Sequence, residues 1–150
     1  MIFYILAFSI LLIDQIIKLV VNNSMALGQT IPLFWILKLT YVRNTGAAFS
    51  LFSGFSSFLT VISVMVVIAV IYFHYKVPEK STALQIGMAC ILGGSLGNLV
   101  DRVFRGYVID YVNFTFWPVF NFADIMINLG VLLIIIKVFI KEKKDASDPV

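Results

Sequence analysis

The sequence predicts a membrane protein that is mainly α-helical, with four transmembrane helices and a few strands at one membrane surface. Of its 150 residues, 61% are hydrophobic and 13% are charged, whereas soluble domains carry about 45–50% and 25%. Its mean hydropathy is +1.00. Four apolar runs approach the length of about 20 residues that a helix needs to cross a bilayer. These runs cover about residues 2–21, 57–75, 83–100 and 122–140.

The connections between the runs are polar and short enough for one domain over residues 1–150. Asn22–Ser24 and Gly28–Thr30 contain turn formers after the first run, and Pro78 lies in the basic link after the second. The first run contains Asp14 and Lys18 and lacks a basic start and a small-residue cleavage site. We therefore expect a retained first helix rather than a secretory signal.

The connection over residues 22–56 is long for so small a protein. Its segment Phe34–Val42 is rich in β-branched and aromatic residues and is bounded by Pro32 and by Asn44–Gly46. This pattern predicts strands. Because open sheet edges are not tolerated in hydrocarbon, we expect the strands to lie on top of the helix bundle.

The distribution of cations predicts that both termini are cytoplasmic, since positive residues favour that side. Five lysines fall on the side of the termini and four cations fall on the other: Lys76, Lys80, Lys141, Lys143 and Lys144 against Lys38, Arg43, Arg102 and Arg105. We expect an aromatic belt at the outer interface, formed by Trp35, Tyr41, Tyr107, Tyr111 and Trp117.

Two aspartates, Asp110 and Asp124, lie where long apolar runs meet short polar connections. Ionisable groups at a membrane are costly and mark functional sites by default. Two carboxylates held close together share a proton, which is the basis of aspartyl chemistry. The alternatives are structural: Asp124 as a favourable charge at a helix start, and Asp110 as a solvated loop residue.

The fourth helix is expected to carry Asn121, Asp124 and Asn128 on one face, at positions i, i+3 and i+7. Asn121 is a suitable helix cap. Asn128 is a full turn deeper than Asp124, so we expect it to find a polar partner inside the bundle.

The remaining charged residues of the spans can pair locally. Asp14 and Lys18 stand at i, i+4 and are expected to form a structural pair within the membrane, since a cation one turn away does not suit a proton-carrying carboxylate. Asp101 with Arg105, and Asn98 with Arg102, have the same spacing and can also pair.

Several classes of site are excluded by composition. The net charge of +3 comes largely from the tail at residues 141–144, so it reports topology rather than nucleic-acid binding. With the single cysteine Cys90 and no H-E-x-x-H or G-x-S-x-G motif, we expect no metal site, no cofactor and no serine nucleophile. Hydrolysis by this chain would need an aspartic mechanism.

Four segments and the pair Asp14 and Lys18 resemble the motifs of bacterial lipoprotein signal peptidases (signal peptidase II) in the family's order. The segments are Arg43–Phe49 (RNTGAAF), Gly93–Arg102 (GGSLGNLVDR), Gly106–Tyr111 (GYVIDY) and Phe120–Asp124 (FNFAD). The resemblance implies four transmembrane helices with a small extracytoplasmic β-cradle, at about residues 22–56 here. It places the catalytic dyad on Asp110 and Asp124 rather than on Asp101. It implies no metal ion.

The resemblance further implies cleavage of prolipoproteins on the amino side of a cysteine that carries diacylglycerol. The expected partners are these substrates and membrane lipids, and the expected state is a monomer in the bacterial cytoplasmic membrane, with the site near the extracytoplasmic face. Residues matching positions around the substrate cleft are Asn44, Gly46, Asn98, Arg102, Asn121 and Ala123. Supporting roles fall to Asp14, Lys18, Asp101 and Asn128.

Two other function classes remain open at the level of sequence. A small ion or proton-coupled transporter would use Asp14, Asp110 and Asp124 as a relay, although these carboxylates lie toward one membrane face. A non-catalytic subunit of a membrane assembly would use the same polar residues as contacts.

Overall fold

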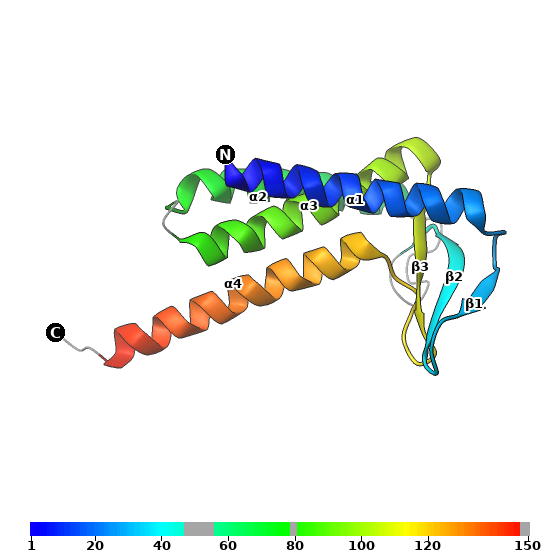
Figure 1. Cartoon of the computed structure of the whole chain (residues 1–150). Coiled ribbons are helices and arrows are strands. Elements are labelled where there is room, and N and C mark those ends of the chain that lie inside the picture. Colours follow the sequence, from blue (N-terminus) through cyan, green and yellow to red (C-terminus); the bar gives the residue numbers. More distant parts are fainter. Residues whose placement is uncertain (47–55, 79–80, 148–150) are drawn as a thin grey trace.

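The four predicted transmembrane helices are present in the structure, a computed structural model that describes residues 1–46, 56–78 and 81–147. They are α1 (Ile2–Ser24), α2 (Ser56–Lys76), α3 (Thr82–Arg105) and α4 (Phe122–Ser147). Within the described residues, four helices are long and apolar enough to cross a membrane. Helix α1 begins and α4 ends at the end of the bundle opposite the sheet (Figure 1). The predicted multi-pass membrane fold is confirmed.

Helix α3 is longer than the sequence pattern indicated. We expected the third apolar span to end near residue 100, but the helix continues through Asp101 and Arg102 to Arg105, in agreement with the helical spacing of these residues. It ends at Gly106, whose φ of 78° places it in the left-handed region that glycine readily adopts. The polar residues stay helical because α1, α2 and the sheet supply partners for them.

Small residues let α3 and α4 approach closely along their whole contact. Gly87 and Gly130 face each other in the apolar half of the bundle. A Cβ added at Gly94 would lie 2.5 Å from the carbonyl oxygen of Ala123, at the start of α4. In a membrane, such contacts replace the hydrophobic effect as the force that holds helices together.

A three-stranded antiparallel sheet lies across one end of the bundle, in the order β1-β2-β3 (Figure 1). Its strands are β1 (Thr30–Pro32), β2 (Leu37–Asn44) and β3 (Val108–Phe114). The predicted cradle at residues 22–56 contains β1 and β2, although β2 begins three residues after Phe34. The third strand was missed, and residues 47–55 of the predicted cradle lie outside the described part of the chain.

An apolar cluster attaches the sheet to the end of α1. It consists of Val21, Met25, Tyr41, Ile109 and Tyr111. Tyr41 and Tyr111 are therefore buried, and the expectation that they belong to an exposed aromatic belt is wrong. The cluster brings β3, which carries Asp110, against the helix that carries Asp14 and Lys18.

Candidate active site

Asp110 lies in the middle of β3, opposite Val42 of β2, and its side chain is buried. The Nδ2 atom of Asn44 donates to one of its oxygens at 2.8 Å. The Nδ2 atom of Asn121 donates to the other at 2.6 Å. Asp110 is therefore held from two directions, by the neighbouring strand and by the segment that leads into α4.

Asp124 lies in the first turn of α4, where it forms a reciprocal capping pair with Asn121. Asn121 Oδ1 accepts from the Asp124 amide at 3.0 Å, and Asp124 Oδ2 accepts from the Asn121 amide at 3.1 Å. This is the arrangement of a capping box, so the predicted capping role is confirmed. The second oxygen, Oδ1, accepts from Asn98 Nδ2 of α3 at 2.8 Å. Asn121 thus bonds to both aspartates.

Three asparagine side chains surround the two carboxylates in a common arrangement. In each one the side-chain nitrogen donates to an aspartate, and the side-chain oxygen accepts from a separate donor that fixes the orientation of the amide. A fixed orientation of this kind limits the rearrangement that a developing charge would require. The donors are Gly46 N to Asn44 (2.9 Å), Lys18 Nζ to Asn98 (2.9 Å) and Asp124 N to Asn121 (3.0 Å).

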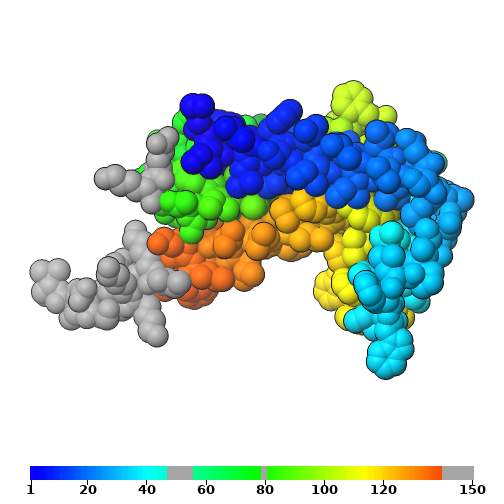
Figure 2. Space-filling model, viewed as in Figure 1, coloured from blue at the N-terminus to red at the C-terminus, as the bar shows by residue number. Residues whose placement is uncertain are grey.

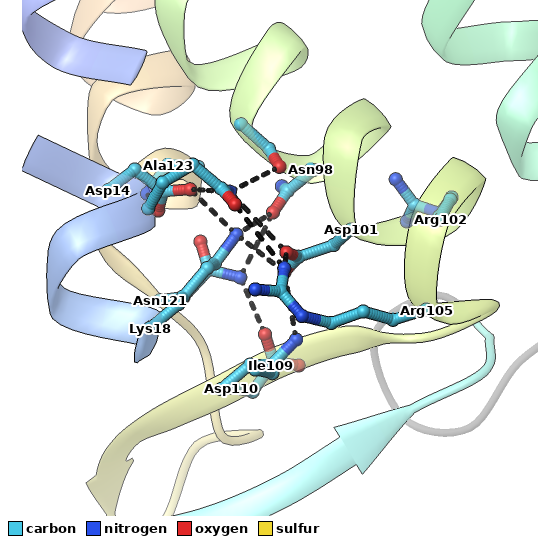
Figure 3. Close-up of polar contacts among 12 residues, drawn as sticks. Asp14, Lys18, Asn98, Asp101, Arg102, Arg105, Ile109, Asp110, Asn121 and Ala123 are labelled. Atoms are coloured by element: carbon cyan, nitrogen blue, oxygen red, sulfur yellow. Dashed lines mark hydrogen bonds and ion pairs between the residues drawn. The ribbon is translucent and has the colours of Figure 1, made fainter. Parts of the chain in front are cut away.

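An ionic cluster, buried except for the partly exposed Arg105, lies next to these amides (Figure 3). Lys18 Nζ lies 2.8 Å from Asp14 Oδ2 and 3.0 Å from Asp101 Oδ2. Arg105 also pairs with Asp101. The expected pairs of Asp14 with Lys18 and of Asp101 with Arg105 are both present, and Lys18 joins them into one cluster.

The ionic cluster holds the two backbone segments that carry Asp110 and Asp124. Asp14 Oδ1 accepts from the amide of Ala123, one residue before Asp124, at 3.1 Å. Asp101 Oδ2 accepts from the amide of Ile109, one residue before Asp110, at 3.1 Å. A carboxylate at a helix N-terminus also interacts favourably with the helix dipole. Asp14 and Asp101 therefore position the site without belonging to the pair.

Two residues of this region were missed by sequence reasoning. Gln15 Nε2 donates to Gly97 O at 3.0 Å and to Asp14 at 3.2 Å. Tyr111 Oη accepts from the Phe122 amide at 3.1 Å and so completes the capping of α4. Gln15 had a signal, since it is a polar residue in an apolar span beside Asp14. Tyr111 had none, because its role depends on the strand pairing.

Two expectations about pairing are corrected by the structure. Asn128 finds no partner inside the bundle among the described residues: its side chain is exposed and donates to the Asp124 carbonyl of its own helix at 2.9 Å. Arg102 donates to Ser63 of α2 at 3.3 Å, because the Asn98 oxygen already accepts from Lys18. Asn128 thus bonds within its own helix, and Arg102 bonds to a neighbouring helix.

The two small predicted residues of the cleft are buried. Gly46 donates its amide to Asn44, and Ala123 packs against Gly94 and Gly97 of α3. The amide of Gly46 thus helps to orient Asn44, and the small side chain of Ala123 lets α4 begin close to α3 beside Asp124.

The environment of Asp110 raises its pKa to about 7. Burial is the main cause, and the negative charge of Asp124 adds to it. The hydrogen bonds from Asn44 and Asn121, with the more distant charge of Lys18, act in the opposite direction. Near neutral pH this carboxyl group can therefore gain or lose a proton readily, which general acid–base catalysis requires.

Within the described residues, no ion pair joins a cation to Asp110 or Asp124. No group of three or more histidine, cysteine, aspartate or glutamate side chains in the same part of the chain is arranged to hold a metal ion. The arrangement offers two carboxyl groups, one of them partly exposed, with oriented amides around them. It suits proton exchange with a bound water.

The family model for signal peptidase II matches residues 6–140. The lipoprotein signal peptidase of Halalkalibacterium halodurans is 40% identical over 149 residues, which cover 96% of each protein. That of Halothermothrix orenii is 39% identical, over 93% of this chain and 97% of its own length. A solved bacterial membrane enzyme superposes with a TM-score of 0.90 at 30% identity, covering 97% of this chain and 92% of its own. The chain therefore belongs to the signal peptidase II family.

Proposed function

We propose that this chain is a membrane aspartic endopeptidase that removes signal peptides from prolipoproteins, cutting on the amino side of a diacylglyceryl-modified cysteine. The observation that carries the proposal is the linkage of Asp110 and Asp124 through Asn121. Membership of the signal peptidase II family supports the same activity.

In the proposed mechanism the two aspartates share one proton and act on a water molecule. One carboxylate accepts a proton from the water as it attacks the scissile carbonyl. The other, in its protonated form, donates a hydrogen bond to the carbonyl oxygen. Two carboxyl groups whose negative charges repel resist double ionisation, so a single shared proton is the favoured state at neutral pH. The raised pKa of Asp110, about 7, supports this division of roles.

Asn44, Asn98 and Asn121 hold the pair in position in this mechanism. Arg102, one turn after Asn98 on α3, supplies a positive charge for the peptide near the cleft. Gly46 orients Asn44 through its amide, and Ala123 lets α4 begin close to α3. We expect Arg102→Ala and Asn44→Ala to weaken processing of the lipid-modified substrate by disturbing how its peptide lies.

The lipid on the substrate is proposed to supply much of the specificity. Burial of acyl chains contributes about 0.8 kcal/mol per methylene, so two chains fix the depth of a substrate more strongly than a few side-chain contacts do. The cleavage site is then presented at the membrane surface, where the dyad lies.

A time course in proteoliposomes tests the function directly. A reporter precursor with a diacylglyceryl cysteine should shift from precursor to mature size, and the same precursor with an unmodified cysteine should be cut much more slowly. Equal rates for both reporters would exclude lipid recognition. No cleavage of either reporter by folded protein would exclude the peptidase and favour the transporter or the assembly subunit.

We further propose that the chain resides in the bacterial cytoplasmic membrane as a monomer, with both termini in the cytoplasm and the sheet outside. The start of α1 and the end of α4 lie at the same end of the bundle, which supports placing both termini on one side of the membrane (Figure 1). In a background with Cys90 replaced, a cysteine introduced at residues 28–30 should react with an impermeant thiol reagent in intact cells. A cysteine in the tail should resist the reagent, and labelling of the tail would reverse the orientation.

A further inference from the structure

An exposed aromatic and aliphatic surface lies at the end of the sheet that is farthest from α1. We call it the sheet tip: residues 33–36, which connect β1 to β2, and residues 115–117, which follow β3. The exposed fractions of its four aromatic side chains are 76% for Phe34, 99% for Trp35, 74% for Phe116 and 58% for Trp117. Neither segment carries a charged residue.

Backbone hydrogen bonds join the two segments of the tip into one unit. The Thr115 amide donates to the Ile36 carbonyl, and the Trp117 amide donates to the Phe114 carbonyl at 2.9 Å. On the other segment, the amides of Leu33 and Phe34 both donate to the Leu37 carbonyl at 3.0 Å. The aromatic side chains are therefore presented by two closed turns.

The location of the tip places it over lipid rather than over protein. The strands cross the end of the helix bundle, with α1 near one end of the strands and the tip at the other, beyond the start of α4 (Figure 1). The tip is the protruding lower edge of the space-filling view (Figure 2). Because the four helices fix the membrane relative to the bundle, a segment that extends sideways from the bundle end meets the interface of the adjoining leaflet.

The chemistry of the tip matches that location. Soluble surfaces rarely expose so many adjacent large apolar side chains. Tryptophan is enriched at the level of lipid headgroups, where its apolar ring and its N–H are both satisfied. A peptide partner would need polar groups to fix its orientation, and the tip offers few.

We infer that the sheet tip inserts into the interfacial region of the lipid leaflet beside the bundle and so forms a membrane contact separate from the four helices. The insertion itself does not depend on the proposed function; only its consequence for cleavage rests on that function. Since β3 leads directly from Asp110 to the tip, insertion fixes the depth of Asp110 relative to a lipid-bearing substrate.

The protein contains its own reporter for this contact, because its only two tryptophans, Trp35 and Trp117, both lie in the tip. The whole chain is reconstituted into phosphatidylcholine vesicles, with or without phosphatidylcholine brominated at carbons 6 and 7. We expect the brominated lipid to remove most of the tryptophan emission, and iodide in the water to remove little. Emission that iodide quenches and brominated lipid does not would overturn the inference.

Variants at Trp35 separate insertion from a chance contact. Trp35→Glu removes no packing, because the side chain is exposed, and should withdraw the tip, so that the emission of Trp117 loses its quenching by brominated lipid. Trp35→Phe should keep that quenching. Gln29→Glu is the matched control, since it adds the same charge at the opposite end of the sheet; its Oε1 partner, the Ala26 amide, is retained. Loss of quenching in this control would also overturn the inference.

Processing of the lipid-modified reporter tests the consequence. Trp35→Glu should slow cleavage in vesicles, while Trp35→Phe and Gln29→Glu should cleave as the unchanged chain does. If neither the variants nor the unchanged chain cleave the reporter, the proposed function fails while the fluorescence result still supports insertion. If quenching by brominated lipid requires added lipid-modified substrate, the tip binds substrate chains instead, and insertion into the leaflet is wrong.

Discussion

Two pairs of aspartates lie within one small region of this protein, and their surroundings differ in kind. Asp14 and Asp101 are fully buried and share the ammonium group of Lys18. Asp110 and Asp124 share the amide side chain of Asn121 instead. The first pair has a cation between its members and the second has a neutral group.

This difference assigns different chemistry to the two pairs. The ammonium group of Lys18 lies within ion-pair distance of both Asp14 and Asp101, so these two carboxyl groups form fixed ionic contacts. An amide satisfies hydrogen bonds without compensating charge, so burial and mutual repulsion raise the pKa of Asp110. In this protein, the partner of each carboxyl group thus decides whether the group forms a fixed ionic contact or can exchange a proton.

The largest expected effect comes from neutralising the second pair. Asp110→Asn or Asp124→Asn should reduce cleavage of the lipid-modified reporter by at least the roughly 10²–10⁴-fold that general acid–base groups contribute. The double variant should be hardly worse than either single one, because groups that act as a unit are not additive. Rates from single-turnover assays decide this, and substantial turnover by either single variant contradicts the aspartic mechanism.

Removing the cation of the first pair should affect folding instead. Lys18→Met leaves the buried carboxylate of Asp14 without a cation, while Asp101 keeps Arg105. Removing one partner of a buried pair costs about 3–5 kcal/mol. The single, buried Cys90 allows the measurement, since a thiol-reactive dye reacts as the chain unfolds with temperature. Asp101→Asn should likewise lower the yield of folded protein more than it changes the rate of cleavage.

A double variant sharpens this prediction. Asp14→Asn combined with Lys18→Met leaves the pair of Asp101 and Arg105 intact and keeps an acceptor for the Ala123 amide. It should be more stable than Lys18→Met alone. If the double variant is less stable, the cost does not arise from an unpaired charge.

The pH dependence of cleavage is expected to follow Asp110. Its folded pKa of about 7 lies above the ordinary value of 3.8, so the folded state holds this proton more tightly than the unfolded chain. The associated stability is fully present below the unfolded pKa and is lost as pH rises toward 7. Since the mechanism needs one shared proton, kcat/KM should fall as pH rises through about 7.

The hydrogen bond from Asn44 allows a test of whether the upper limb of the pH profile belongs to Asp110. Its hydrogen bond lowers the pKa of Asp110, so Asn44→Ala should move the upper limb of the kcat/KM profile to higher pH. Thr30→Ser, on the outer strand, should leave the limb in place. A shift to lower pH in Asn44→Ala would show that the limb belongs to another group.

The smallest expected effect is at Asn128. Its side chain is exposed and bonds only to its own helix among the described residues. Asn128→Ala should therefore change stability by no more than about 0.5 kcal/mol, as for ordinary surface substitutions. A large loss of cleavage would restore the supporting role that its sequence position suggested.

Sequence alone located the helices and most of the polar residues of the site. A transmembrane helix satisfies its own backbone, so its position follows from local composition, and the four spans could be predicted to within a few residues except at the end of α3. Asp14, Lys18, Asp110 and Asp124 could also be selected, because charged residues in or beside apolar runs are conspicuous.

The tertiary structure decided which of these residues meet and in what state. The side-chain hydrogen bond from Asn44 to Asp110 joins residues that are 66 positions apart in the sequence. It depends on the pairing of β2 with β3, which local sequence patterns do not specify. The contact of Asp101 with the Ile109 amide and that of Tyr111 with the start of α4 depend on this pairing. The composition of the chain thus fixed its membrane fold, while burial and the choice between cation and amide partners, which only folding brings together, determined the chemistry of each carboxylate.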